Sequence, residues 1–172
     1  MVRIEPITEI ERIELVRTLF REYQASIGVD LCFQGFEAEL ASLPGAYAAP
    51  GGCLLLAYVD DGCAGCIALR PLKDAQSGTD GEMKRLYVRP DFRGLQIGRL
   101  LTERVLHEAR AIGYQRIVLD TMSSMHAAQA LYRSLGFVAP LVTSKAPTCG
   151  HPKAPTQDVV NCNPIGRDRS VF

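Results

Sequence analysis

Apolar residues in the first part of the chain recur at helical spacing after one short strand-like segment at residues 2–5. One stripe whose successive members are three or four positions apart predicts an amphipathic helix: Ile13, Val16, Phe20, Tyr23 and Ile27. Thr8 and Glu11 stand three residues apart and form a candidate capping box at its start, and Gly28 suits its end. A shorter helix is predicted at residues 36–43.

The remaining pattern predicts further strands and helices. Apolar runs at residues 53–59 and 63–69 flank Asp60-Asp61-Gly62, a strong hairpin signal, and residues 73–81 are polar. The later elements are a strand at 82–88, a helix at 98–112, a strand at 116–121, a helix at 127–135 and an extended segment from Phe137. The order is strand, two helices, three strands, helix, strand, helix, strand. This order predicts an α/β (α+β) fold, in which helices cover both faces of a mixed sheet.

Composition narrows the function classes. The 172 residues include 19 basic and 19 acidic side chains, so we expect no nucleic-acid partner. No apolar run reaches the length that crosses a bilayer, and the N-terminal residues lack the apolar stretch of a secretory signal. We therefore expect a cytoplasmic protein with no membrane partner. Its six cysteines would then be reduced.

Cysteine spacing gives a weak signal for metal or redox chemistry. Cys63 and Cys66 form a C-x-x-C, and Cys149, His151 and Cys162 could complete a site. However, the C-x-x-C lies in a strand-like apolar run, and the other three show no zinc-finger pairing. We expect buried or bystander thiols and no metal.

The segment 86–101 carries the clearest chemical signal. A predicted strand ends, a glycine-containing turn follows, and a helix begins at once. The first turn of a helix offers unpaired N–H groups and the positive end of its dipole, and Arg93 and Arg99 add positive charge. This arrangement predicts a cradle for a pyrophosphate, unless Gly94 and Gly98 only shape a tight connection. The segment lacks the Gly-Lys-Ser/Thr of a P-loop and the spacing G-x-G-x-x-G.

The chain resembles the GCN5-related N-acetyltransferase (GNAT) superfamily in three ordered blocks. Residues 93–98 are similar to its R/Q-x-x-G-x-G/A signature, residues 82–88 to its fourth strand, and residues 130–137 to its A-x-L-Y-x-x-x-G-F block. The order of elements matches over residues 2–139. The resemblance implies a mostly antiparallel mixed sheet and a cleft for acetyl-coenzyme A (acetyl-CoA) where the fourth and fifth strands splay apart.

The resemblance also implies how acetyl-CoA, the co-substrate, is held. Backbone groups of the fourth strand would pair with the pantetheine arm, and N–H groups of the turn would hold the pyrophosphate. The implied cofactor-binding residues are Leu86, Tyr87, Val88, Arg93, Gly94, Leu95, Gln96, Ile97, Gly98 and Arg99. Two positions depart from the family pattern. Gln96 replaces the usual first glycine, and Met125 replaces an Asn that touches the cofactor, although Ser123 or Ser124 would be able to cap the helix or to replace that contact.

Two side chains align with catalytic positions of the family. Glu82 corresponds to the general base that deprotonates the amine, whose pKa is otherwise ~10.4, and we expect burial to raise the pKa of Glu82. Tyr132 corresponds to the acid that protonates the leaving thiolate. The structural alternatives are a Glu bonded to a nearby loop and a Tyr that only packs. His107 and His126 are expected at the surface or in packing.

The sequence thus predicts an N-acetyltransferase (an acyltransferase) that moves an acetyl group to a primary amine by direct attack in a ternary complex. The alternative is a non-catalytic acyl-CoA-binding or sensor module with the same fold. The acceptor would be a small-molecule or peptide amine, and Arg70, Lys84 and Arg85 give a weak hint of an acceptor that carries a carboxylate. The resemblance is compatible with a homodimer.

Residues 140–172 differ from the rest of the chain. Prolines recur there with little apolar alternation, and Val159-Val160 is too short a run to predict the strand with which the family ends. We therefore expect an N-acetyltransferase domain at 1–139 and an atypical, poorly ordered tail at 140–172. One hypothesis is a frameshift in the gene. It predicts that another reading frame of the same DNA encodes a GNAT-like final strand.

Overall fold

The computed structural model describes residues 1–7, 12–28, 31, 35–73, 78–122 and 124–138, and the backbone of residues 157–162. The helices are α1 (Ile13–Ile27), α2 (Phe36–Ser42), α3 (Ile97–Ile112) and α4 (His126–Ser134), with 3-10 turns η3 (Gly45–Tyr47) and η4 (Pro90–Phe92). The strands are β1 (Val2–Pro6), β2 (Cys53–Val59), β3 (Gly62–Pro71), β4 (Asp80–Val88), β5 (Arg116–Met122), β6 (Phe137–Val138) and β7 (Gln157–Cys162). In the described part of the chain, no helix combines the length and the apolar character that a membrane crossing requires.

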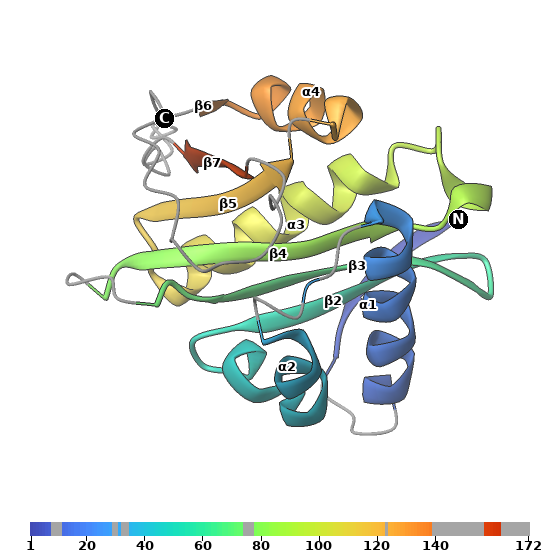
Figure 1. Ribbon diagram of the computed structural model, residues 1–172, viewed down its shortest axis with the longest axis horizontal. Coiled ribbons are helices and arrows are strands. Elements are labelled where there is room, and N and C mark those ends of the chain that lie inside the picture. Colours follow the sequence, from blue (N-terminus) through green and yellow to red (C-terminus); the bar gives the residue numbers. More distant parts are fainter. Residues whose placement is uncertain are drawn as a thin grey trace, which may run out of the picture.

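The strands form one sheet in the order β1-β2-β3-β4-β5-β7-β6. The pairing of β4 with β5 is parallel, and the other described pairings are antiparallel. In Figure 1, α1 and α2 lie in front of the sheet and α3 passes behind it. The predicted mixed, mostly antiparallel sheet with helices on both faces is therefore confirmed.

Each face of the sheet has its own hydrophobic core because the central strands are apolar on both sides. On β2, Leu55 packs in the core beneath α3, whereas Leu54 and Leu56 pack in the core beneath α1 and α2. This burial on both faces explains why the run at residues 53–59 is continuously apolar and does not alternate.

The expectation that no final strand follows Phe137 is wrong. Residues 157–162 form β7, which pairs antiparallel with β5 from Met122↔Gln157 to Val118↔Asn161 and with the short β6. The segment contains only two central valines, and it forms a strand because it pairs with the edge of β5. A local sequence pattern does not reveal that such an edge is available. Residues 139–156 and 163–172 lie outside the described residues, and so the predictions of poor order and of a frameshift stay predictions.

The boundaries of the other elements differ from the predicted ones by one or two residues. Strand β4 begins at Asp80 where the sequence predicted a loop to residue 81, and α3 begins at Ile97. The predicted capping box, Thr8 and Glu11, lies outside the described residues. The N-cap of α1 is Arg12, and its side chain makes no capping hydrogen bond.

Candidate active site

Strands β4 and β5 separate partway along their length. Their parallel pairing runs from Asp80↔Arg116 to Met83↔Leu119 and covers no later residue of β4. The opposite edge of β4 continues to pair with β3, as far as Gly65↔Val88. Within the described residues, the edge of Leu86–Val88 that faces away from β3 therefore has no partner strand, as the family resemblance implied.

A bulge in β4 accompanies this separation. The register with β3 shifts between Cys66 and Ala68, and Arg85, opposite this shift, has a left-handed φ of 60°. A bulge bends its strand and increases the local twist, which turns the end of β4 away from β5. The amide of Arg89 donates to the Ala64 carbonyl of β3 (2.9 Å). Because successive amides of a strand point to opposite edges, the amide of Val88 points to the unpaired edge.

The turn after β4 leads directly into the N-terminus of α3. Gly94 and Gln96 adopt left-handed φ values of 82° and 57°, and Ile97 begins the helix. The amide of Leu100 donates to the Gln96 carbonyl (3.0 Å), as the first bond of the helix. The amides of residues 97–99 therefore have no partner within the helix, and they lie at the positive end of its dipole. The predicted anion cradle has the expected backbone geometry.

The unpaired edge of β4 and the start of α3 line one groove of about 850 Å³. Of the ten predicted cofactor-binding residues, nine line it: Leu86, Tyr87, Val88, Arg93, Gly94, Gln96, Ile97, Gly98 and Arg99. Leu95 does not line it, and its side chain is 51% exposed. The other residues that line the groove are Met125 and Ser124, which the sequence reasoning placed beside the cofactor, and Tyr23, Ser26, Ile27, Phe92, His126, Ala127, Ala128 and Leu131.

Helix α1 supplies one wall of the groove and is fixed to the end of β4. The Arg89 guanidinium binds both carboxylate oxygens of Glu22 (2.7 and 2.9 Å) and also donates to the Cys63 carbonyl. The hydrogen bond from Arg89 lowers the pKa of Glu22. The rings of Tyr23 and Tyr87 meet edge to face at 6.3 Å. The stripe that predicted α1 included Tyr23, but periodicity alone does not reveal that it faces a ligand groove.

The start of α4 differs from the expected capping. Its N-cap is Met125, which makes no side-chain capping bond, so Ser124 does not cap the helix, and Ser123 lies outside the described residues. Met125 lines the groove with an apolar side chain where the family has an amide. His126, which was expected at the surface, is exposed but lines the groove.

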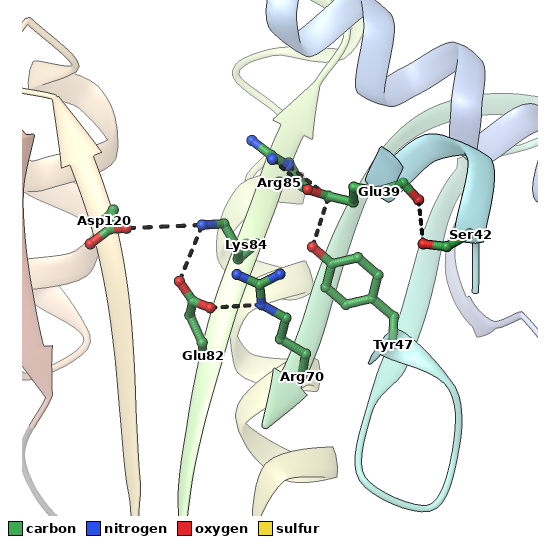
Figure 2. A network of polar contacts seen from close by, with 8 residues as sticks. All are labelled: Glu39, Ser42, Tyr47, Arg70, Glu82, Lys84, Arg85 and Asp120. Carbon is green, nitrogen blue, oxygen red and sulfur yellow. Dashed lines mark hydrogen bonds and ion pairs between the residues drawn. The ribbon is translucent and has the colours of Figure 1, made fainter. Parts of the chain in front are cut away.

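Glu82 lies in an ion-pair network on the α2 side of the sheet (Figure 2). Its carboxylate accepts from Arg70 Nε at 2.7 Å and from Lys84 Nζ at 3.1 Å, and its side chain is 9% exposed. Burial raises the pKa of Glu82, but the charges and hydrogen bonds of Lys84 and Arg70 outweigh burial and lower it. The expectation of a raised pKa is therefore wrong, because Arg70 of β3 and Lys84 of β4 both bind the carboxylate.

A second pair joins helix α2 to the bulge in β4. Arg85 donates to both carboxylate oxygens of Glu39 (2.7 and 3.0 Å), and Tyr47 also donates to this carboxylate (2.8 Å). The guanidinium of Arg85 lies 5.2 Å from the Phe36 ring centroid. The cations Arg70, Lys84 and Arg85, which suggested an acceptor with a carboxylate, are thus all paired with carboxylates of the protein itself.

Tyr132 lies on α4, is 6% exposed, and packs against Phe137 with ring centroids 5.5 Å apart. Burial raises the pKa of its phenol, so the hydroxyl carries its proton at neutral pH. Tyr132 lines a hollow of about 20 Å³ beside the groove. Leu86 and Met125 line both this hollow and the groove. The sequence reasoning did not single out another member of this hollow, Asp120 of β5.

The structure describes the side chains of three of the six cysteines. Cys53, Cys63 and Cys66 are free thiols, and burial raises the pKa of each. No group of three or more His, Cys, Asp or Glu side chains in the described ranges is arranged to hold a metal ion. Cys149 and His151 lie outside those ranges.

Comparison with known proteins agrees with this geometry. A family model described as the Acetyltransferase (GNAT) family matches residues 14–137. An uncharacterized N-acetyltransferase of Schizosaccharomyces pombe is 41% identical over 124 residues, which cover 70% of this chain and 73% of the relative.

Solved structures share the fold. A GNAT-family acetyltransferase of Staphylococcus aureus superposes with a TM-score of 0.73 at 20% identity, covering 96% of this chain and all of its own. A protein of Salmonella typhimurium, solved with its cofactor acetyl-CoA, superposes with a TM-score of 0.64 at 20% identity, covering 94% of this chain and 91% of its own. Because the family model spans most of the sequence and the yeast relative is similar over most of both chains, this protein belongs to the GNAT family and is an acetyltransferase.

Proposed function

We propose that the protein transfers the acetyl group of acetyl-CoA to a primary amine by direct attack in a ternary complex. One observation carries the proposal: the unpaired edge of Leu86–Val88 and the free amides at the start of α3 open into the same groove. An extended thioester arm with a diphosphate at one end needs both features, one for each part.

The residues present fit acetyl-CoA. The unpaired edge of β4 would bind the pantetheine amides as an added strand, and the Val88 amide would polarise the thioester carbonyl. The amides of residues 94–99 would hold the pyrophosphate, since the Arg93 amide already donates to the Pro90 carbonyl (3.1 Å). The side chains of Arg93 and Arg99 would add charge at its margin. A hydrogen bond to Ser134 (2.7 Å) and a contact with Glu103 (3.4 Å) orient the Arg99 guanidinium beside the groove, which supports this role. Because most of these contacts are backbone contacts, Gln96 in place of glycine is compatible with binding.

Tyr132 is proposed as the acid that protonates the leaving thiolate. Its phenol is protonated at neutral pH and lines a hollow next to the groove, which supports this role. Glu82 stays a candidate for the base, because it lies on β4 as the resemblance implied. Its two cation partners weaken it in that role, since they stabilise the carboxylate in its charged form.

The test is an acceptor screen with the purified full-length chain. Acetyl-CoA is titrated by calorimetry, and then a panel of primary amines is incubated with enzyme and acetyl-CoA while thiol release and acetylated product are measured. We expect binding heat, and a product whose formation matches thiol release one to one.

Two outcomes would contradict the proposal in different ways. Absence of binding heat would remove the assignment of the groove. Binding heat and thermal stabilisation by acetyl-CoA, without product from any amine, would favour the alternative of an acyl-CoA-binding module.

A further inference from the structure

A small hollow of about 40 Å³ adjoins the cofactor groove on the side of β5. Tyr23, Ile27 and Met125 line both the hollow and the groove, so an acceptor in the hollow would lie next to the cofactor's reactive end. The other residues that line the hollow are Leu31, Met83, Lys84, Arg85, Asp120, Thr121 and Met122. Its walls combine apolar side chains with charged and polar ones, and its size suits an amino group with a few carbon atoms.

The charged groups in and behind the hollow differ in how fully they are paired. Arg85 binds Glu39 through two hydrogen bonds, and Lys84 binds Glu82, which also binds Arg70. Figure 2 shows Asp120 at the end of this chain of contacts, across the gap between β4 and β5. Its described partner is Lys84, whose Nζ lies 3.9 Å from the carboxylate, and its side chain is 33% exposed.

A second residue of β5 that lines the hollow, Thr121, carries a hydroxyl without a hydrogen-bond partner in the described part of the chain. The Oγ1 atom of Thr121 is buried without a hydrogen bond to any described residue, and the residue is 4% exposed. A buried hydroxyl without a hydrogen-bond partner destabilises the free protein. Asp120 and Thr121 are neighbours on β5, and both line the hollow.

From this arrangement we propose that Asp120 binds the acceptor ammonium group and takes its proton, and that the acceptor is a small primary amine without a carboxylate beside the amino group. This inference rests on the proposed acetyl transfer. It assigns to Asp120 the role that the family resemblance implied for Glu82. Glu82 then acts as a positioning residue, because it holds Lys84 at a distance from Asp120.

The proposed step conserves atoms and charge. The R–NH3⁺ group gives one proton to the Asp120 carboxylate, and the freed lone pair forms a C–N bond with the thioester carbonyl carbon. The C–S bond breaks, and its electron pair leaves with sulfur, which takes a proton from the Tyr132 phenol. The nitrogen gives its second proton to the Tyr132 phenolate, and Asp120 releases its proton to solvent. The products are the amide, free coenzyme A and one proton.

The electrostatics of the hollow agree with this role. Burial raises the pKa of Asp120, against the opposing effects of Lys84, Arg70 and Arg85, whereas Glu82 acts in the same direction as burial. Tyr23 of α1 and Tyr132 of α4 also face the hollows that Asp120 lines. A raised pKa makes a carboxylate a better proton acceptor. The two cations that line the hollow, Lys84 and Arg85, are already paired with carboxylates of the protein, and an acceptor carboxylate there would be repelled by Asp120.

The experiment compares D120N with E82Q, using the best acceptor from the amine panel at saturating concentration across a pH series. We expect D120N to lower kcat by about 10²–10⁴-fold and to remove the fall in kcat on the acidic side. In E82Q, Lys84 is released to pair with Asp120, so the acidic fall in kcat should shift to lower pH and persist. Acetyl-CoA affinity, measured by calorimetry, should be unchanged in D120N, which shows that the variant is folded.

A substrate pair tests the acceptor class. We expect 3-methylbutylamine to have a kcat/KM at least ~10-fold above that of leucine, which is the same molecule with a carboxylate beside the amino group. D120N with wild-type kcat and pH profile would overturn the role of Asp120, and a preference for leucine would overturn the acceptor class. Both results leave acetyl transfer in place. A wild-type protein inactive on every amine would overturn acetyl transfer and this inference together.

Discussion

Replacing Glu39 with Gln should destabilise the protein strongly, because this change leaves a buried guanidinium without its counter-charge. The side chains of Arg85 and Glu39 are 2% and 10% exposed and are joined by two short hydrogen bonds. Removal of one partner from a buried ion pair costs about 3–5 kcal/mol. For a domain of this size, that loss corresponds to a fall in Tm of about 6–20 °C.

The same helix offers a matched control. Glu37 also binds an arginine through two contacts, Arg21 at 3.3 and 3.4 Å, but these side chains are 63% and 58% exposed. Glu37→Gln should therefore change the free energy of unfolding by no more than ~0.5 kcal/mol. The assay is urea unfolding followed by circular dichroism, with the slope checked for two-state behaviour.

Equal costs for the two Glu→Gln changes would refute the reasoning, because burial is the property in which the two pairs differ most. A double variant gives an independent check. Glu39→Met combined with Arg85→Met removes both charges from the buried site and should recover most of the stability lost in Glu39→Gln. If the double variant is as unstable as the single one, the loss comes from packing and not from an uncompensated charge.

The Glu39 pair also predicts a pH dependence. Burial raises the pKa of Glu39, but Arg85 and Tyr47 outweigh burial and lower it below its ordinary value of 4.5. A carboxyl with a lowered folded-state pKa stabilises the protein fully above its unfolded pKa, and this contribution is lost as the pH falls through the folded pKa. The stability difference between wild type and Glu39→Gln should therefore shrink below about pH 4.5. A difference that stays constant down to about pH 3 would contradict this assignment.

Three further comparisons, with five substitutions between them, test the groove. Val88→Pro removes the amide that points to the unpaired edge and should weaken acetyl-CoA binding at least ~10-fold by calorimetry, whereas Val88→Ala keeps the amide and should bind nearly normally. Gln96→Gly should raise the free energy of unfolding by roughly 0.5–1 kcal/mol, because glycine adopts the left-handed φ of 57° without strain. Gly94→Ala should lower it by about 1 kcal/mol, because a new Cβ has open space but the φ of 82° strains an alanine. Thermal melts that shift in the opposite directions would contradict both expectations. In Gly65→Ala the new Cβ would lie 2.2 Å from the Tyr87 carbonyl oxygen, so we expect a loss of about 1–3 kcal/mol and weaker cofactor binding, and wild-type values in both assays would show that β4 can move away freely.

The sequence by itself determined most of the helices and strands and the free amides at the start of α3. The spacing of apolar residues predicted α1 and α3 within a few residues, and the turn from Arg93 to Gly98 predicted the free amides at the start of α3. These features depend on contacts within a few positions of the chain. Periodicity, glycine placement and helix ends therefore report them directly.

The tertiary structure decided the electrostatics of the acceptor side and the last strand. Asp120 and Lys84 come together only because β5 lies beside β4, and Arg70 reaches Glu82 only because β3 pairs with β4 in this register. The same holds for β7, which pairs with β5 although its own pattern is weak. A pKa depends on charges within a few ångströms, whatever their separation in sequence. The sequence could therefore point to Glu82 only through its resemblance to a family position. The folded chain shows that the Glu82 carboxylate is paired with two cations and that Asp120 is the more exposed carboxylate.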